Sequence, residues 1–430
     1  MVHDQYTKLG SVFTISFLGK KVTFLVGPEV SSHFFQASDS EISHGKILEF
    51  TVPMFGKDVG HAVGVTVRTE QNRFVSDALI PSKLRCHVGS MLQEVEDYFS
   101  EWGQEGTVDL KQELEQLLML ISGQCLLGKE VREKMFGEVL TLLHQLIDNS
   151  LRLTTVLFPY APTPTNRRRD KARVRLSELF AEIVRSRKST TNQIEEDVLQ
   201  NLIDARHRDG RPTTEGEVTG LILSLIFAGK HTSSTTSTWT GARLLNNPTW
   251  LAAAVKEQER IIEKYGENNI TYNILQEMDV LQRCIKETLR MHPPAPSFLR
   301  TVHKNFTVRT REGDEYEIPR GHMVASPVLF NSNLPYIYKD PEVFDPDRFG
   351  PSREEDRVGG KYSYTAFSGG KHACVGENYA YMQIKMIWSH LLRNFELELV
   401  SPFPKTSWKK LVLEPDGKVM VWYKRRRLCS

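Results

Sequence analysis

Apolar residues recur every three or four positions over much of the chain, which is the spacing of one helix face. Helices are expected over 70–102, 110–127, 166–188 and 218–245. The last of these has a clear start, because Thr214 and Glu217 are placed as the two partners of a capping box. The chain is therefore predicted to be mainly α-helical.

Short stretches alternate apolar and polar residues and predict small β-sheets. Three hairpins are expected, formed by 11–17 with 22–26, 305–309 with 315–318, and 411–413 with 419–423. The segment 52–67 is expected to be an irregular loop, because Pro53 and three glycines interrupt any helix there. Long loops of this kind often line binding sites.

The middle of the long helix is rich in hydroxyl side chains, with eight in the ten residues 231–240. Serine and threonine compete with the helix backbone for hydrogen bonds, so we expect the helix to be weakened and bent there. The preceding residues 221–227 are apolar on all sides, which indicates a buried helix, and Ala228 and Gly229 leave room for a flat ligand. A polar helix face would explain the hydroxyl groups, but buried hydroxyl groups beside a gap favour a groove for proton delivery.

Composition narrows the possible classes of protein. Apolar residues make up 40% of the chain and charged residues 25%, which is typical of a globular chain with enough material for a core. The net charge of +2 gives no indication of nucleic-acid binding.

Five cysteines without CxxC spacing argue for reduced thiols in a cytosol-facing compartment, and against a disulfide framework or a zinc site. The sequence contains neither an apolar run of 18 residues nor a signal peptide. The basic run 167–173 is interpreted as a solvated helix face, with docking of an acidic protein as the first alternative and nucleic-acid binding as a distant second.

One cysteine stands in a setting that suits iron chemistry. Cys374 lies in a glycine-rich turn just before a predicted helix, where the positive end of the helix dipole favours a thiolate over a thiol. Gly369, Gly370 and Gly376 are expected to permit positive φ angles and to let a flat ligand approach the backbone closely. A thiolate in such a turn can hold iron.

Two neighbouring side chains support this interpretation. Phe367 would shield the sulfur from water, and His372 could donate a hydrogen bond to an anionic group at the edge of a cofactor. A single cysteine is more often a buried structural residue. The complete spacing Phe-x-x-Gly-x-His-x-Cys-x-Gly, however, resembles the heme-binding loop of the heme-thiolate monooxygenases, the cytochrome P-450 superfamily.

This resemblance implies a cytochrome P-450 fold, mainly α with small β-sheets, in which heme b (iron protoporphyrin IX) lies between the long helix and the cysteine loop. Cys374 would be the axial ligand of the heme iron, and thiolate ligation favours cleavage of the O–O bond. The heme propionates would be held by His372 and Arg300, with Arg73 as a weaker candidate. The other cofactor-binding residues that the resemblance implies are Phe367, Gly370, Gly376, Ala228 and Gly229.

The long helix carries a second signature. Residues 228–232 match the oxygen-binding helix of the family, which implies a role for Thr232 in proton delivery. His231 occupies the position where many members have an acid, and by resemblance it pairs with Asp148 from another helix. That pairing would hold His231 charged, so Thr232, His231 and Asp148 are the candidate catalytic residues.

A third signature is structural. Glu287 and Arg290 share one helix face at i, i+3 spacing, a pattern that alone is weak because it decorates ordinary surface helices. In the monooxygenases the matching residues form a buried ion network with a second arginine, here Arg348. Buried charges are tolerable only when each is paired. These three residues are therefore given a structural role.

The resemblance covers essentially the whole chain and is strongest to the sterol 14α-demethylases, the plant group in particular. It rests on the segments 167–170, 210–213, 228–234 and 380–385. It implies a tetracyclic sterol or a related triterpene as substrate, O₂ as oxidant, and electrons from NADPH through NADPH–cytochrome P-450 reductase.

The departures from the family cluster where the sterol should bind. Plant demethylases characteristically read Phe-Asp-Val-Asp-Tyr where residues 61–65 read His-Ala-Val-Gly-Val, and Ala295 lowers the bulk on the facing strand. The substrate pocket is expected to include His61, Val65, Phe55, Phe227 and Ser297. The wider pocket favours a divergent member that oxidises a sterol or triterpene scaffold. The alternatives are an authentic obtusifoliol-type 14α-demethylase and a non-catalytic homologue that binds heme or a hydrophobic ligand.

The chain 1–430 is expected to form one catalytic domain that begins after the N-terminal membrane anchor usual in eukaryotic relatives. By resemblance, the missing anchor would hold it on the cytosolic face of the endoplasmic reticulum membrane. It is expected to act as a monomer, with the reductase as its protein partner and without nucleic acid.

Overall fold

The computed structural model describes residues 2–17, 19–45, 47–148, 150–189, 196–267 and 269–428. The chain forms two compact units, each built from two segments of the sequence. We call Met1–Leu48 with Gln282–Cys374 the sheet unit, and Glu49–Leu281 with Val375–Ser430 the helical unit. The expected fold class, mainly α with small sheets, is confirmed; the single catalytic domain stays a prediction.

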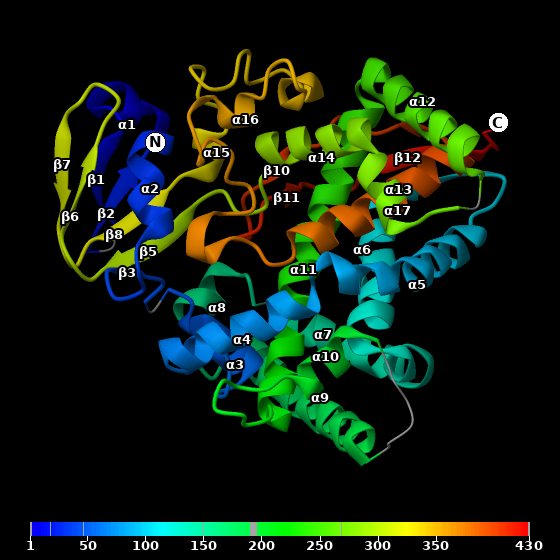
Figure 1. The fold of residues 1–430 in the computed structure, drawn as a ribbon, viewed down its shortest axis with the longest axis horizontal. Helices are drawn as coiled ribbons and strands as arrows, with labels where there is room; N and C mark the ends of the chain where they lie inside the picture. The colour runs from blue at the N-terminus through cyan, green and yellow to red at the C-terminus, as the bar shows by residue number, and fades with distance from the viewer. Residues whose placement is uncertain are drawn as a thin grey trace. The chain divides into compact units, whose positions relative to one another are not determined.

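The sheet unit is built around a five-stranded sheet in the order β1-β2-β8-β5-β3 (Figure 1). Its strands are β1 (Val12–Phe17), β2 (Lys20–Leu25), β8 (Met323–Ser326), β5 (Phe298–Val302) and β3 (Ile42–Ser43). β1 and β2 form the first expected hairpin, with Val12 opposite Leu25, while Leu18 in its turn lies outside the described residues. β6 (Phe306–Arg309) and β7 (Glu315–Ile318) form the second.

Alternation along the strands gives this sheet two apolar faces. On one face Leu25 packs with Phe34 and Phe35 of α2 (Pro28–Gln36). On the other face Phe24 packs with Ala325 and the segment after α15 (Val328–Asn331). The remaining helices of the unit are α1 (Val2–Leu9), α16 (Glu355–Val358) and most of α14 (Asp279–Met291).

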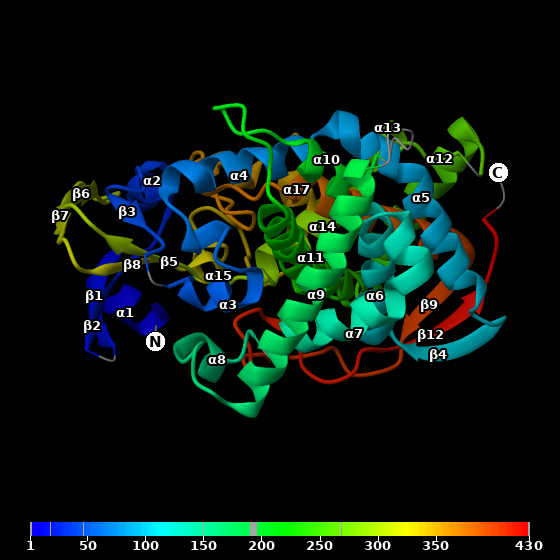
Figure 2. The same cartoon turned by 90° about the horizontal axis from the view of Figure 1, so that it is seen from below.

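The helical unit surrounds one long helix, α11 (Glu215–Leu245), which packs against α6, α9 and α17 (Figure 2). The larger helices are α4 (Val65–Ala78), α5 (Pro81–Ser100), α6 (Leu110–Ser122), α7 (Phe136–Ile147), α9 (Pro164–Ser189), α12 (Pro248–Tyr265) and α17 (Glu377–Asn394). Shorter ones are α3 (Val52–Phe55), α8 (Leu153–Leu157), α10 (Val198–Asp204) and α13 (Tyr272–Glu277). The expected capping box is present: Glu217 N donates to Thr214 Oγ1 (3.1 Å), and Thr214 N donates to the Glu217 carboxylate (3.0 Å).

Two expectations about local structure were wrong. Pro53 does not break a helix but stands in the first turn of α3, where its missing N–H costs nothing. The third hairpin does not form, because β12 (Met420–Arg425) has both edges occupied by β4 (Glu105–Asp109) and β9 (Phe395–Leu399). The short strand β11 (Glu414–Pro415) pairs instead with β10 (Thr406–Ser407).

Across the described ranges of the chain, no helix combines the length and the apolar character needed to cross a membrane.

Candidate functional site

The Cys374 loop forms a compact turn in the sheet unit. A 3-10 turn over Gly370–His372 precedes Cys374, whose backbone N–H donates to the Phe367 carbonyl at 2.9 Å. This bond closes the loop and leaves the cysteine exposed. Helix α17 begins three residues later in the sequence, at Glu377. The loop thus presents a thiol on its outer side, as a ligand to a flat cofactor requires.

Only one loop glycine needs a positive φ angle. Gly370 has φ +61°, whereas Gly369 is extended and Gly376 has φ −90°, so only Gly370 of the three uses the positive φ angle that glycine permits. A Cβ at Gly370 would stand 2.0 Å from the Phe35 carbonyl oxygen of α2. Ser368 also adopts positive φ, at +62°. Close approach of the loop to α2 is therefore what makes Gly370 necessary.

Gly370→Ala is expected to reduce heme retention and to lower the free energy of unfolding. A matched control is Gly360→Ala, because Gly360 also has positive φ (+90°) but its added Cβ would meet nothing within 4 Å. Both variants lose free energy of unfolding because alanine disfavours a positive φ angle. Gly370→Ala loses roughly 1–3 kcal/mol more because its Cβ overlaps the Phe35 carbonyl. Urea unfolding and heme content per protein measure the two effects. Equal losses in the two variants would contradict the requirement for close approach.

Arg300 on β5 is a buried guanidinium without a carboxylate partner in the described part of the chain. Its NH1 donates to the Phe34 carbonyl, its guanidinium stacks 4.4 Å from the Phe34 ring centre, and its Nε has no hydrogen-bond partner there. Burial lowers the pKa of Arg300 to about 10. Among the described residues, Asp39 is the one carboxylate that acts on it, from beyond ion-pair distance. A buried cation without a direct carboxylate partner fits an anionic group of a ligand.

His372 has a different setting from the one expected. Its Nε2 lies 3.2 Å from Asp39 Oδ1, and its ring meets the His44 ring edge-on at 4.9 Å.

An exposed thiol, a glycine at a close approach and a buried cation in one unit fit an anionic iron porphyrin. Arg73 contributes nothing comparable: it is exposed on α4, where it donates to the Arg206 carbonyl at 2.9 Å and lies 3.8 Å from Asp77. Its role at the cofactor remains only a prediction.

The three residues expected to form an ion network lie together, fully buried in the sheet unit. Arg290 donates to both oxygens of Glu287 at 2.7 and 2.9 Å, and Arg348 Nε donates to Glu287 Oε1 at 3.0 Å. Arg348 NH1 also donates to Glu355 at 2.6 Å. Glu355 was missed, because it belongs to no motif and reaches the network from α16. A fourth member could have been sought from charge balance, since two arginines need two acids.

α11 keeps its helical path through the hydroxyl-rich stretch as a single helix from Glu215 to Leu245. Thr232 Oγ1 donates to the Ala228 carbonyl at 2.6 Å, the local bond that this residue type favours. Not every hydroxyl group serves a groove, because Ser233 accepts from Gln383 of α17 (2.6 Å) and Ser237 from Trp388 (3.0 Å). These bonds hold two buried helices together.

One short stretch of α11 is less buried than the rest. Ala228 is exposed, and Gly229 and Thr232 are half-buried, within a helix that is otherwise largely inaccessible. A Cβ added at Gly229 would meet nothing within 4 Å. Because residues four apart share a helix face, Ala228 and Thr232 mark an open strip on α11. This strip fits the expectation of room for a flat ligand.

The expected pairing of His231 with Asp148 is present only as a long ion-pair contact without a hydrogen bond. His231 Nε2 lies 3.9 Å from Asp148 Oδ1, beyond hydrogen-bond distance. Asp148 accepts instead from Lys230 and from His144 (2.9 Å). Burial, followed by the neighbouring Lys230 ammonium, lowers the pKa of His231 to about 4. This shift favours the neutral imidazole, whereas the sequence predicts a charged one; the protonation state of His231 stays a prediction.

The expected pocket residues occupy several places. Phe55 and Phe227 meet edge-on with ring centres 5.4 Å apart, and Val65 at the start of α4 is half exposed. His61 lies in a 3-10 turn over Gly60–Ala62. In the sheet unit, Ser297 Oγ donates to the Ser326 carbonyl at 3.2 Å. Their role in binding substrate stays a prediction.

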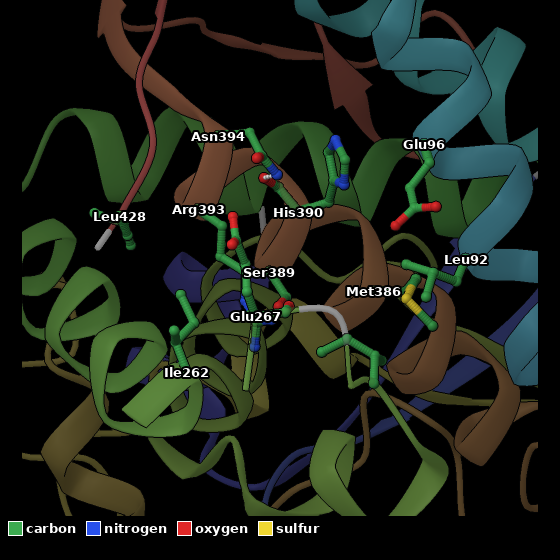
Figure 3. A pocket seen from close by; sticks show the side chains of 11 residues that line it. Leu92, Glu96, Ile262, Glu267, Met386, Ser389, His390, Arg393, Asn394 and Leu428 are labelled. Atoms are coloured by element: carbon green, nitrogen blue, oxygen red, sulfur yellow. Dashed lines mark hydrogen bonds between the residues drawn. The ribbon is translucent and has the colours of Figure 1, made fainter. Parts of the chain in front are cut away.

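Cavities within the helical unit touch only part of the predicted site. Phe55 lines one of about 470 Å³ and Asp148 another of about 520 Å³. A smaller cavity of about 90 Å³, shown in Figure 3, is lined by Glu96, His390 and Arg393 among others and by none of the predicted residues. It therefore has no part in the site derived from the sequence.

Comparison with known proteins agrees with this geometry. The family model Cytochrome P-450 matches residues 1–421. The chain is 55% identical over 428 residues to an obtusifoliol 14-alpha demethylase of Sorghum bicolor, with all of this chain and 86% of that protein aligned. It is 53% identical over 428 residues to a sterol 14-demethylase of Arabidopsis thaliana (100% of this chain, 87% of that protein), and 35% identical over 430 residues to a lanosterol 14-alpha demethylase of Bos taurus (99% and 83%).

A solved structure also supports the fold. The retinoic acid-bound cyanobacterial CYP120A1 superimposes with a TM-score of 0.86 at 21% identity, covering 99% of this chain and 94% of that one. Together with the match of residues 1–421 to the family model, this likeness accounts for the mainly helical architecture with small sheets. The chain is a monooxygenase of the cytochrome P-450 family, whose members use O₂ at a thiolate-ligated heme iron, and it belongs within that family to the plant sterol 14-demethylases.

Proposed function

We propose that this protein removes the 14α-methyl group of an obtusifoliol-type sterol. The observation that carries the proposal is 53–55% identity, over all of this chain, with plant proteins named obtusifoliol or sterol 14-demethylase. This reverses the order of the two hypotheses drawn from the sequence, in which a divergent enzyme came first. The reversal follows because the similarity extends over the whole chain, whereas the departures concern a few residues near 61–65 and 295–297.

The heme would be held by residues of the sheet unit. Cys374 supplies the axial thiolate, Arg300 binds a propionate through the Nε that has no hydrogen-bond partner in the described chain, and Gly370 lets the loop close on α2. His372 would reach a second propionate by leaving Asp39. When bound, the heme iron supplies the activation of O₂ that thiolate ligation promotes. By the family resemblance, Thr232 on the open strip of α11 would hold a water or a proton for that reaction.

Electron supply and location belong to the same proposal. NADPH–cytochrome P-450 reductase would deliver the electrons, and the enzyme would work at the cytosolic face of the endoplasmic reticulum membrane. The support for both is membership in this family of monooxygenases.

A second candidate function is oxidation of a triterpene, and one observation favours it. A Cβ added at Gly64 would meet nothing within 4 Å, and Val65 beside it is half exposed. At this point of the expected wall the plant demethylases carry an acid and an aromatic side chain. Lost aromatic area weakens binding of a rigid apolar skeleton by about 25 cal/mol per Å². This wall would therefore leave more room for a larger skeleton than the wall of the plant demethylases does, and binding of such a skeleton would be less unfavourable here.

Spectral titration of the purified ferric holoprotein separates the two candidates. An obtusifoliol-type sterol is expected to shift the heme Soret band at lower concentration than a pentacyclic triterpene, because the proposed site accommodates a tetracycle. A Val65→Tyr variant, which restores an aromatic side chain, should tighten binding of the sterol and weaken binding of the triterpene. Saturation by the triterpene with no response to the sterol would contradict the proposal and favour the second candidate.

A further inference from the structure

A buried ammonium group lies at the centre of a polar cluster beside His231. Lys230 on α11 is almost fully buried, and its Nζ contacts three side chains, from α6, from α7 and from the residue that follows α7. It donates to Asp148 Oδ1, which directly follows α7, lies 3.1 Å from His144 Nδ1 of α7, and lies 3.1 Å from Glu115 Oε1 of α6. The lysine therefore ties α11 to both neighbouring helices by charge.

The cluster has the residue types of a metal site, but it already contains its cation. Glu115, His144 and Asp148 bring one ligand atom each within 4.8 Å of one another. The Lys230 ammonium contacts all three and stands between the two carboxylates, where a metal ion would otherwise stand. The arrangement is thus an internal ion cluster.

The cluster joins solvent to the buried face of α11. Glu115, His144 and Asp148 are each about one third exposed or more, and they line the cavity of about 520 Å³. On the inner side, His231 is buried, and its Nε2 has no hydrogen-bond partner in the described part of the chain. Asp148 is the acid nearest to that nitrogen, but its carboxylate is engaged by Lys230 and His144.

Charged groups on each element packed against His231 shift the pKa of its imidazole. Lys230 on α11 and Lys410 in the segment before β11 favour the neutral imidazole, whereas Glu115 of α6 and Asp148 favour the charged one. Burial alone would raise the pKa of Asp148, but the hydrogen bonds from His144 and Lys230 lower this pKa to about 2. Both shifts favour an ionised Asp148 carboxylate, which is hydrogen-bonded to the lysine, beside a neutral His231.

We propose that Lys230 is a positioning residue that holds the Asp148 carboxylate away from His231 and so sets the protonation state of that imidazole. A proton arriving from the open cavity then reaches His231 only when Asp148 moves from the ammonium to the imidazole. In this step the Asp148 carboxylate accepts a proton from water in the cavity and passes it to His231 Nε2, which regenerates the carboxylate, so that only O–H and N–H bonds are broken and formed. The link to turnover rests on the proposed function, in which His231 takes part in proton delivery.

The test is the titration of His231 in the ferrous, carbon monoxide-bound holoenzyme, which is diamagnetic. Protein labelled with ¹³C-histidine is titrated by NMR, and His231→Asn assigns the signal. Lys230→Met is expected to raise the midpoint of His231 by about one pH unit or more, because a nearby cation is lost and Asp148 is released. Lys230→Arg keeps the charge, so the midpoint of His231 should stay low in this variant. If Lys230→Met fails to fold, a raised midpoint in Lys230→Arg would still overturn the proposal.

Lys410→Met is the matched control. Lys410 also disfavours the charged form of His231, but it pairs with Glu414 (3.0 Å) and no contact with Asp148 is present in the described chain. If only net charge mattered, Lys410→Met would raise the midpoint as much as Lys230→Met, and that result would overturn the proposal. An unchanged midpoint in Lys230→Met would overturn it as well.

Coupling distinguishes this proposal from the proposed function. The ratio of product formed to NADPH consumed is measured across pH for the same variants. A pH profile that moves with the NMR midpoint supports both. A midpoint that moves while the coupling profile stays fixed supports the positioning role of Lys230, and contradicts a role of His231 in proton delivery.

Discussion

Cys374→Ser is expected to abolish the red-shifted Soret band that marks a thiolate-bound heme–carbon monoxide complex, together with all NADPH-dependent oxidation. Serine keeps the size of the side chain but supplies no thiolate at neutral pH, and the exposed sulfur of Cys374 is the group that the loop presents. The loop itself should survive, because the bond that closes it joins the backbone of Cys374 to Phe367. Carbon monoxide difference spectra and product analysis measure the two losses.

Cys86→Ser provides the control for this experiment. Cys86 is also exposed, on α5, but a hydrogen bond involving Glu196 raises the pKa of its thiol and makes it a poor metal ligand. This variant should keep both the spectrum and the activity. A Cys374→Ser protein that retained the thiolate spectrum would refute the assignment of the ligand.

Glu287→Gln is expected to cost roughly 3–5 kcal/mol of unfolding free energy, the range for breaking a buried ion pair. Glu287 accepts from Arg290, from Arg348 and from the Asp345 backbone, and all three side chains of the network are fully buried. Glutamine removes the negative charge and leaves two guanidinium groups compensated by Glu355 alone. Urea unfolding of the holoprotein, followed by heme absorbance and by circular dichroism, measures the loss.

An exposed ion pair in the same unit gives the comparison. Glu354 and Arg357 pair at the surface, with side chains 48% and 73% exposed. Such pairs contribute about 0–1 kcal/mol, so Glu354→Gln should change stability little. A loss below about 1 kcal/mol in Glu287→Gln would show that the buried network does not stabilise the fold.

Local patterns predicted most of the elements and the parts of the site that depend on one segment. The capping box at Thr214 and Glu217, the first two hairpins and the turn around Cys374 each follow from residues close in the sequence. The third hairpin was wrong because strand pairing is decided by distant segments. Residues 105–109 and 395–399 occupy both edges of β12, and no local pattern announces this competition.

The errors at the site have a similar cause. Sequence alone does not show that Lys230 reaches Asp148 before His231 does, because three helices bring the groups together. The need for glycine at 370 comes from the Phe35 carbonyl, which lies far away in the chain. The buried hydroxyl groups of Ser233 and Ser237 bond to α17, a contact invisible to the pattern within α11.

Turnover with two substrates in parallel tests the proposed sterol 14α-demethylation most directly. Purified holoenzyme, NADPH and cytochrome P-450 reductase are supplied with an obtusifoliol-type sterol or with a pentacyclic triterpene, and products are identified by mass spectrometry and NMR. The predicted result is a sterol product that lacks the 14α-methyl group, with the triterpene unchanged. Oxidation of the triterpene, with the sterol recovered intact, would contradict 14α-demethylation and leave a divergent monooxygenase in its place.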